Sequence, residues 1–244
     1  MNKSAGPIID DAFGHALWAQ YNDIDIPEII ETRDGYIWVN AANGYRYYLT
    51  PYAEWPSWEK EIIREMRGRV LDVGCGAGRH SLHAQELGHE TTAIDSSWLA
   101  SEVARHRGVQ DARCLSLEHI FDLGPGSYDT VLLLGYNLGL LGSAARAPFL
   151  LDLLDKATSE SGIIIGSTQD PTGSDERSFA RDANGDPMHG HTTIRIRYCN
   201  KTTEWFDYWY ASVGAIEEAI AKTRWKMRTC ITEDRVVAVV LEKK

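Results

Sequence analysis

Three glycines and their neighbours carry the clearest chemistry in this sequence. Gly74, Gly76 and Gly78 follow the apolar run 70–73, whose lack of a helical period predicts a buried strand. The glycines predict a sharp turn with bare backbone that a ligand can approach closely, and a helix is predicted to follow over 79–87. A ligand is therefore expected at the carboxyl end of a strand and near a helix N-terminus, where nucleosides bind in α/β sheets.

The spacing of the glycines distinguishes between kinds of nucleoside. A dinucleotide site requires Gly-x-Gly-x-x-Gly, in which the third glycine makes room for the pyrophosphate. Here the third glycine comes one residue early, and Arg79 would crowd the place where that pattern needs no side chain. A nicotinamide-dependent oxidoreductase is therefore disfavoured.

A carboxylate follows at the distance that a βαβ unit demands. The stretch 89–94 reads as the next strand and ends in Asp95. A carboxylate at this place can accept hydrogen bonds from both hydroxyls of a ribose, and such charge-assisted bonds are strong. Asp95 is therefore predicted to bind a ribose.

The segment 70–78 followed by Asp95 resembles the first two motifs of the class I S-adenosylmethionine-dependent methyltransferases, and the resemblance extends over about 69–244. It implies an α/β fold with a doubly wound, Rossmann-like, seven-stranded sheet whose last strand, 236–241, is reversed. It also implies S-adenosylmethionine as the cofactor, bound by these residues: Asp72, Gly74, Cys75, Gly76, Gly78, Asp95 and Ser96.

Later contacts implied by the resemblance follow the next two strands. After the strand 111–115, the adenine contacts fall on Ser116 and Leu117, with Glu118 as an alternative; Ser116 also reads as a plain strand end. After the apolar strand 127–134, the backbone of Gly135 is expected to meet the methionine amine. Tyr136 and Asn137 are expected near the transferred methyl group, or alternatively as packed loop residues.

Composition limits the partners of the protein. A net charge of −10 over 244 residues and a pI near 5.3 disfavour binding to nucleic acid, which needs clustered Lys and Arg. No apolar stretch approaches the roughly 20 residues that span a bilayer, and no signal peptide is recognised. Four cysteines without Cys-x-x-Cys pairing indicate no metal site and favour a reducing cytoplasm. The oligomeric state stays open.

The chain divides into an aromatic-rich front segment, 1–56, predicted to be a cap or lid, and the methyltransferase domain, 57–244. Tyr48 and Tyr52 of the front segment are candidate contacts for the methyl acceptor. Ser57 is predicted to cap a helix that runs to Gly68. An insertion after the fifth strand, about 171–211, is predicted to comprise a polar loop and a β-hairpin of 193–198 and 203–210. Packing is the expected role of the hairpin's aromatic residues, although Trp205 and Trp209 on one face would be available to a flat substrate.

The implied reaction is a direct in-line displacement at the methyl carbon, which moves the methyl group to a small molecule through oxygen, nitrogen or carbon. Alignment of the reactants is most of the task, and a base is needed only if the acceptor must lose a proton. Asp170, His80 and Tyr136 are candidate catalytic residues, with His189 and His191 as further histidines near the insertion. A non-catalytic nucleoside-binding domain is the leading alternative.

Overall fold

A seven-stranded sheet forms the centre of the molecule. The computed structural model describes residues 11–40, 44–171 and 190–244. The strands lie in the order β11-β12-β7-β6-β3-β4-β5, and β12 runs antiparallel to both of its neighbours while the other adjacent pairs are parallel. Their bounds are β3 Val70–Val73, β4 Thr91–Asp95, β5 Ala112–Cys114, β6 Tyr128–Leu133, β7 Thr158–Gln169, β11 Trp225–Glu233 and β12 Val236–Lys243. The predicted sheet with a reversed last strand is confirmed.

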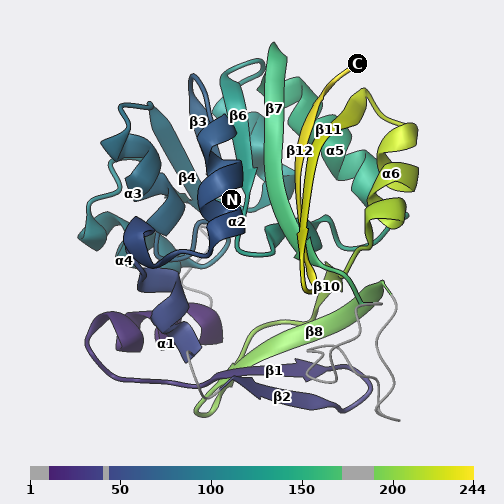
Figure 1. Cartoon of the computed structure of the whole chain (residues 1–244). Helices are drawn as coiled ribbons and strands as arrows, with labels where there is room; N and C mark the ends of the chain where they lie inside the picture. Colours follow the sequence, from purple (N-terminus) through teal and green to yellow (C-terminus); the bar gives the residue numbers. More distant parts are fainter. Residues whose placement is uncertain (1–10, 41–43, 172–189) are drawn as a thin grey trace, which may run out of the picture.

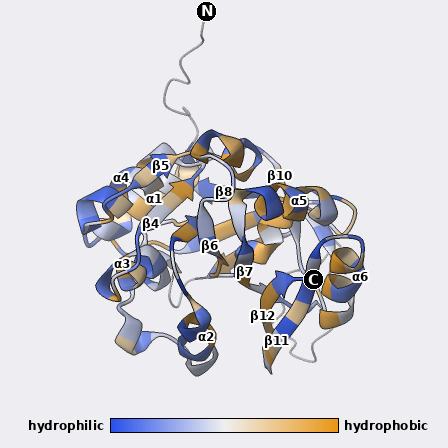
Figure 2. Cartoon of the chain, turned by 90° about the horizontal axis from the view of Figure 1, so that it is seen from above, coloured by the Kyte–Doolittle hydropathy of each residue, from blue (hydrophilic) through white to orange (hydrophobic). Residues whose placement is uncertain are grey.

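Helices cover the sheet because its central strands are apolar on both faces. In β6, Val131 and Leu133 pack in one core with α5 and α6, whereas Leu132 packs in another core with α2 and α3. Hydrophilic residues of α2, α3 and α4 lie at the periphery (Figure 2). The helices are α1 Ala12–Tyr21, α2 Ser57–Ile62, α3 Arg79–Glu86, α4 Trp98–Arg107, α5 Ala147–Ala157 and α6 Val213–Ala221, with 3-10 turns η1 Gly44–Leu49, η2 Tyr52–Glu54, η3 Ile63–Glu65, η4 Leu117–Leu123 and η5 Asn137–Leu141.

A second, antiparallel sheet lies beside the carboxyl ends of the parallel strands (Figure 1). We call it the small sheet; it comprises β1 Glu28–Thr32, β2 Ile37–Asn40, β8 His191–Tyr198, β9 Lys201–Thr202 and β10 Phe206–Trp209. Strand β1 of the front segment pairs directly with β8 of the insertion, in a register that sets Ile29 opposite Arg197. The front segment and the hairpin, which the sequence analysis treated separately, are therefore parts of one sheet.

The two faces of the small sheet differ in chemistry. Strand alternation puts Glu28, Ile30 and Thr32 on one face of β1, and Ile30 and Thr32 stand opposite the apolar side chains of β8, Ile196 and Ile194. On the other face, Glu31 forms ion pairs with its neighbours on β8, Arg195 and Arg197. Glu28 is therefore the acidic residue of an otherwise largely apolar face.

The helix that follows the front segment is shorter than predicted. It forms α2, the 3-10 turn η3 follows over 63–65, and the last predicted residues, 66–68, are not helical. Ser57 is the first helical residue rather than a side-chain cap, and its hydroxyl donates to Glu233 instead. Trp58 is buried in the core beneath α2, as expected.

The small sheet contacts the core through Tyr208. A Cβ atom placed on Gly139 would lie 2.2 Å from Cζ of Tyr208, so the ring occupies the space that any larger residue needs. We expect Gly139→Ala to lower the free energy of unfolding by about 1–3 kcal/mol in urea denaturation, because the ring must move. Gly214→Ala in α6 is the matched control, since its Cβ meets nothing within 4 Å; there alanine should stabilise the helix by up to ~1 kcal/mol. Equal effects of the two variants would contradict the contact.

Candidate functional site

The turn after β3 is held against the end of β4 by backbone hydrogen bonds. The amides of Gly74 and Cys75 both donate to the carbonyl oxygen of Ile94, at 2.8 and 3.0 Å. The amide of Gly76 donates to Oδ2 of Asp95 at 2.9 Å. The two predicted cofactor motifs, which lie apart in the sequence, therefore meet in the structure.

Asp95 is a buried carboxylate at the carboxyl end of β4. Besides Gly76, the amide of Ser97 donates to its Oδ1 at 2.8 Å. Burial raises the pKa of Asp95 to about 6, although these two backbone hydrogen bonds act in the opposite direction. The neighbouring Ser96 is exposed at the edge of the sheet. Asp95 is thus fixed in orientation by two backbone amides, in an environment that is unfavourable for its charge.

Two of the three glycines are required by close packing. A Cβ on Gly74 would lie 2.6 Å from Nδ2 of Asn137, and that same nitrogen donates to the carbonyl oxygens of Val73 and Gly74. A Cβ on Gly78 would lie 2.5 Å from Cγ2 of Val109. The Asn137 amide therefore ties the loop after β6 to the loop after β3, and Gly78 allows close packing behind the turn.

Aromatic rings face the remaining glycine. A Cβ on Gly76 would lie 3.4 Å from Cδ1 of Tyr48 and 3.7 Å from Cζ of Phe13. These two rings meet edge to face, with centroids 5.4 Å apart. Tyr52, in contrast, stacks on His83 of α3, with centroids 4.0 Å apart. Of the two tyrosines selected from the sequence, Tyr48 is the one that lies against the glycine turn.

A buried polar network connects α2 with the start of α3. Glu59 is fully buried; it forms an ion pair with Arg79 and a hydrogen bond with Nε2 of His80, the latter at 2.9 Å. Tyr47 donates its hydroxyl to Oε2 of Glu59 at 3.2 Å. Burial alone would raise the pKa of Glu59, but His80 and Arg79 together hold it below its usual value. The sequence analysis missed Glu59, because its partners lie some twenty residues away along the chain.

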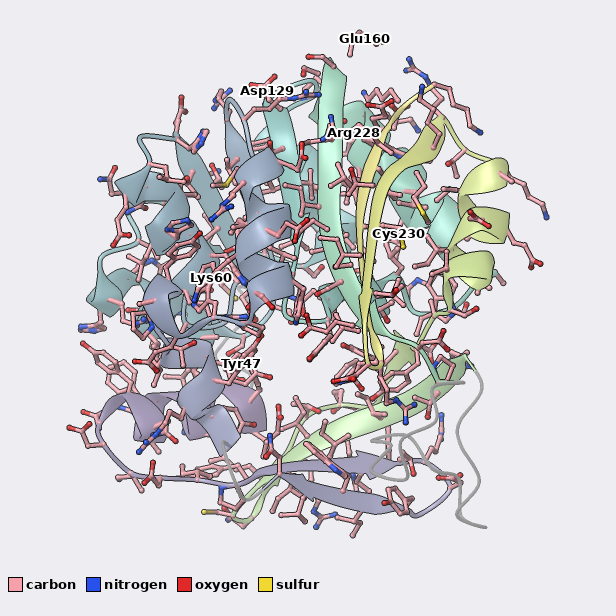
Figure 3. All side chains as sticks on the ribbon, in the orientation of Figure 1. Tyr47, Lys60, Asp129, Glu160, Arg228 and Cys230 are labelled. Carbon is pink, nitrogen blue, oxygen red and sulfur yellow. The ribbon has the colours of Figure 1, made fainter. Side chains whose placement is uncertain are left out.

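Arg79 lies between two aromatic rings. Its guanidinium carbon is 4.1 Å from the ring centroid of Tyr47 and 4.8 Å from that of Trp55. Tyr47, labelled in Figure 3, lies on the side of α2 that is nearer the small sheet. Nη1 of Arg79 is buried and has no hydrogen-bond partner among the described residues. One donor nitrogen of this buried cation is thus unsatisfied within the described ranges.

The loop after β6 completes this end of the sheet. Tyr136 adopts a left-handed backbone conformation, with φ of 69°, which is uncommon for a side chain of its size. Its amide donates to Oγ of Ser167 at 3.0 Å, and its carbonyl accepts from the hydroxyl of Tyr208 at 2.6 Å. A Cβ on Gly135 would lie 3.9 Å from Cε1 of His80. The Gly135 loop is therefore held between the polar network and the small sheet.

Other predicted site residues lie around these loops. Asp72 is buried, accepts from Oγ of Ser81 at 2.5 Å, and has its pKa raised by burial. Cys75 is also buried. Ser116 interacts with Nδ1 of His119 at 2.8 Å, and Leu117 packs against the core. Glu118, the alternative adenine contact, forms an ion pair with Arg146.

The candidate bases have different surroundings. His80 belongs to the buried network, whereas Asp170 follows β7. The amide of Asp170 donates to the carbonyl oxygen of Arg235, and the guanidinium of Arg235 donates to the carbonyl oxygen of Asp170. Nε2 of His191 lies 3.0 Å from Oδ1 of Asp207, and His189 lies outside the described residues. Among the residues that the structure describes, no group of three or more His, Cys, Asp or Glu side chains could hold a metal ion. No helix in the described ranges is long and apolar enough to cross a membrane.

Two further residues depart from the sequence analysis. Trp209, which was expected to be open to a flat substrate, is buried in the core of the large sheet. Glu28, which was not singled out, accepts a hydrogen bond from the hydroxyl of Tyr48 at 2.8 Å. Burial raises the pKa of Glu28 to about 7, against the lowering effect of that bond. The sequence signal that could have identified Glu28 is a single acidic residue on the otherwise largely apolar face of its strand.

Comparisons with known proteins agree with this arrangement. Residues 71–138 match the family model described as a methyltransferase domain. A ubiquinone biosynthesis O-methyltransferase of Xanthomonas euvesicatoria pv. vesicatoria is 47% identical over 68 residues, which are 26% of this chain and 28% of that protein. The aligned part thus spans less than a third of that relative.

Solved structures resemble a larger part of the chain. A methyltransferase from Bacteroides fragilis, described as S-adenosylmethionine-dependent and in complex with S-adenosylhomocysteine, has a TM-score of 0.82 at 24% identity and covers 98% of each chain. The Burkholderia thailandensis 1,6-didemethyltoxoflavin-N1-methyltransferase has a TM-score of 0.50 at 15% identity and covers 72% of this chain and 70% of its own. The order of the large sheet and the contact between the two motifs agree with these likenesses. The chain has the fold of the class I S-adenosylmethionine-dependent methyltransferases, and its residues 71–138 resemble a methyltransferase domain.

Proposed function

We propose that this protein transfers the methyl group of S-adenosylmethionine to a small molecule. The observation that carries the proposal is the contact between the two motifs, in which Asp95 accepts from the amide of Gly76 at the carboxyl edge of the sheet. Ligands of doubly wound sheets bind at this edge. A carboxylate held there by backbone amides can still accept hydrogen bonds from both ribose hydroxyls.

The residues present fit such a cofactor. The ribose would bind Asp95, the adenine would lie near Ser116 and Leu117, and the methionine part would follow the loop that contains Gly74, Cys75, Gly76 and Gly78, with Asp72 behind it. The amino group would meet Gly135. The unpartnered Nη1 of Arg79 supports a carboxylate at this end, because a buried guanidinium donor without a partner is costly.

The small sheet is proposed to be the cap over the methyl acceptor. Residues 1–56 and the insertion would then form one functional unit on the methyltransferase domain, 57–244, although the two segments lie far apart in the sequence. Tyr48 reaches the glycine turn from the front segment, and Tyr208 reaches the loop of Tyr136 and Asn137 from the insertion. The acceptor would lie between these contacts.

The residues of the chain would chiefly align the reactants. The bound cofactor supplies an electrophilic methyl group on a sulfonium, and alignment with the acceptor is worth on the order of 7–11 kcal/mol. Names of relatives support a small acceptor, since one acts in ubiquinone biosynthesis as an O-methyltransferase and another is an N1-methyltransferase of 1,6-didemethyltoxoflavin.

Thermal unfolding with added ligands tests the proposal. S-adenosylmethionine and S-adenosylhomocysteine should raise the melting temperature, because a ligand that binds only the folded state stabilises it by about 2.7 kcal/mol at one hundred times its Kd. NAD should have no effect. Stabilisation by NAD alone would overturn the proposal, and ligand binding without release of S-adenosylhomocysteine from any acceptor would favour a non-catalytic nucleoside-binding domain.

The affinity for S-adenosylhomocysteine should depend on pH through Asp95. The ribose hydroxyls donate to the ionised carboxylate, and burial raises the pKa of this group in the free protein to about 6. Lowering the pH through this value adds a proton that competes with the ligand, so Kd should rise up to tenfold per pH unit below it and stay constant above it. Calorimetric titrations between about pH 5 and 8 measure this, and an unchanged Kd would place the ribose elsewhere.

A further inference from the structure

Glu28 stands out as a carboxylate on the largely apolar face of the small sheet. Its neighbours on the same face of β1 are Ile30 and Thr32, and these two stand opposite Ile196 and Ile194 of β8. An acid at such a position is costly unless it interacts with a donor or a cation. Within the described residues, Tyr48 supplies one hydrogen bond to Glu28.

The surroundings of Glu28 are tyrosines from two elements. Tyr45 and Tyr48 of η1, Tyr208 of β10 and the following Tyr210 all interact electrostatically with its carboxylate. No basic side chain of the described ranges contributes to the pKa of Glu28, which is set by burial and by Tyr48. The site therefore combines an unbalanced negative charge with aromatic rings, a combination that binds cations.

Glu28 is also close to the two loops that would hold the methionine part of the cofactor. Its partner Tyr48 contacts the space beside Gly76, and Tyr208 donates to the carbonyl of Tyr136 and packs on Gly139. The carboxylate thus lies among side chains that touch both loops. A group bound to Glu28 would lie beside Tyr48, which borders the glycine turn.

A second observation points to a ligand at this place. Tyr45 is fully buried, stacks on Tyr48 with ring centroids 5.5 Å apart, and its hydroxyl has no hydrogen-bond partner among the described residues. A buried hydroxyl normally finds a partner, because an unsatisfied one costs about 1–3 kcal/mol. A polar ligand near Glu28 would supply it.

We propose that Glu28 binds the protonated nitrogen of an amine and that this amine is the methyl acceptor. The inference rests on the proposed function and specifies its acceptor class. In the reaction, the ammonium group gives one proton to the Glu28 carboxylate, which frees the nitrogen lone pair. The lone pair forms the new N–C bond, the S–C bond breaks with its electrons remaining on sulfur, and the positive charge passes from sulfur to nitrogen.

Binding of matched probes to the protein saturated with S-adenosylhomocysteine tests the inference. Benzylamine, tyramine and tryptamine are compared by calorimetry with their neutral counterparts, benzyl alcohol, tyrosol and tryptophol, in the wild-type protein and in the Glu28→Gln variant. At least one amine should bind the wild type tenfold or more tightly than its alcohol, and Glu28→Gln should abolish the preference. The preference should grow between about pH 6 and 8, as Glu28, with a pKa of about 7, becomes ionised.

Glu31→Gln is the matched control. Glu31 lies on the same strand but on the opposite face, where it pairs with Arg195 and Arg197, so this change should leave the amine preference intact. For an amine that is methylated, Glu28→Gln should also lower kcat about 100-fold. Equal or tighter binding of the alcohols, or an amine preference that survives in Glu28→Gln, would overturn the inference. If S-adenosylhomocysteine itself fails to bind the wild type, the proposed function fails instead.

Discussion

Replacement of Asp95 by alanine is expected to lower the affinity for S-adenosylhomocysteine about 100-fold while the protein stays folded. Two charge-assisted hydrogen bonds to ribose are worth roughly 1.5–3 kcal/mol each, and a factor of ten in Kd corresponds to about 1.4 kcal/mol. The expected loss of binding free energy is smaller than the sum of the two hydrogen bonds, because water can fill part of the space that the carboxylate leaves. The measurement is a calorimetric titration of both proteins above the pH at which Asp95 titrates.

The fold should tolerate this change because the carboxylate is itself in an unfavourable environment. Burial raises the pKa of Asp95, so the folded state carries its charge at a cost that alanine removes, which offsets the loss of the bonds from Gly76 and Ser97. Asp111→Ala is the control, because Asp111 precedes β5 at the opposite edge of the sheet and pairs with Arg113. Unchanged affinity in Asp95→Ala, or equal losses in both variants, would contradict the ribose site.

Replacement of Glu59 by alanine is expected to give the largest loss of stability, about 3–5 kcal/mol. Glu59 is fully buried and balances Arg79, which is itself buried between Tyr47 and Trp55. Removal of one member of a buried ion pair leaves the other charge uncompensated, and the cost of that charge dominates. The midpoint of urea denaturation should fall accordingly, with the slope unchanged.

The same network should make stability depend on pH. Because the pKa of folded Glu59 lies below its usual value, the stabilisation is present at neutral pH and is lost as the pH falls through the acid range. Glu61→Ala on the same helix is the control, since Glu61 is exposed and should change stability by less than about 0.5 kcal/mol. A similarly small effect of Glu59→Ala would mean that Arg79 finds another partner.

Local signals were enough to predict individual strands of the large sheet and its glycine turn. The strands that became β3, β6 and β7 are apolar runs bounded by glycines or polar residues, and the carboxylate of Asp95 lies one strand beyond the turn, where βαβ geometry requires it. These features depend on residues that are near one another in the sequence. For this reason the glycine turn after β3 and the acid at the end of β4 agree with the structure, whereas the reversed last strand was implied by the family resemblance and not by these local signals.

Features that depend on distant partners were not predictable in this way. Strands β1 and β2 are four or five residues long and pair with each other, but the other neighbour of β1 is β8, across most of the chain. In the sequence, Glu59 is one of several charged residues of a short helix. Its role becomes visible only in the folded structure, where Arg79 and His80 lie beside it. The positions of Tyr48 and Tyr52 likewise depend on how η1 and η2 pack, since both are tyrosines of one aromatic-rich segment.

The pairing of β1 with β8 has a consequence for engineering new specificity. Because one side of this ladder comes from the front segment and the other from the insertion, a chimera that imports only residues 1–56 from a relative would set a foreign strand against the native β8. Cross-strand partners such as Glu31 and Arg195 would then be mismatched. Grafting both segments together would preserve these pairs, so the two must be exchanged as a single module.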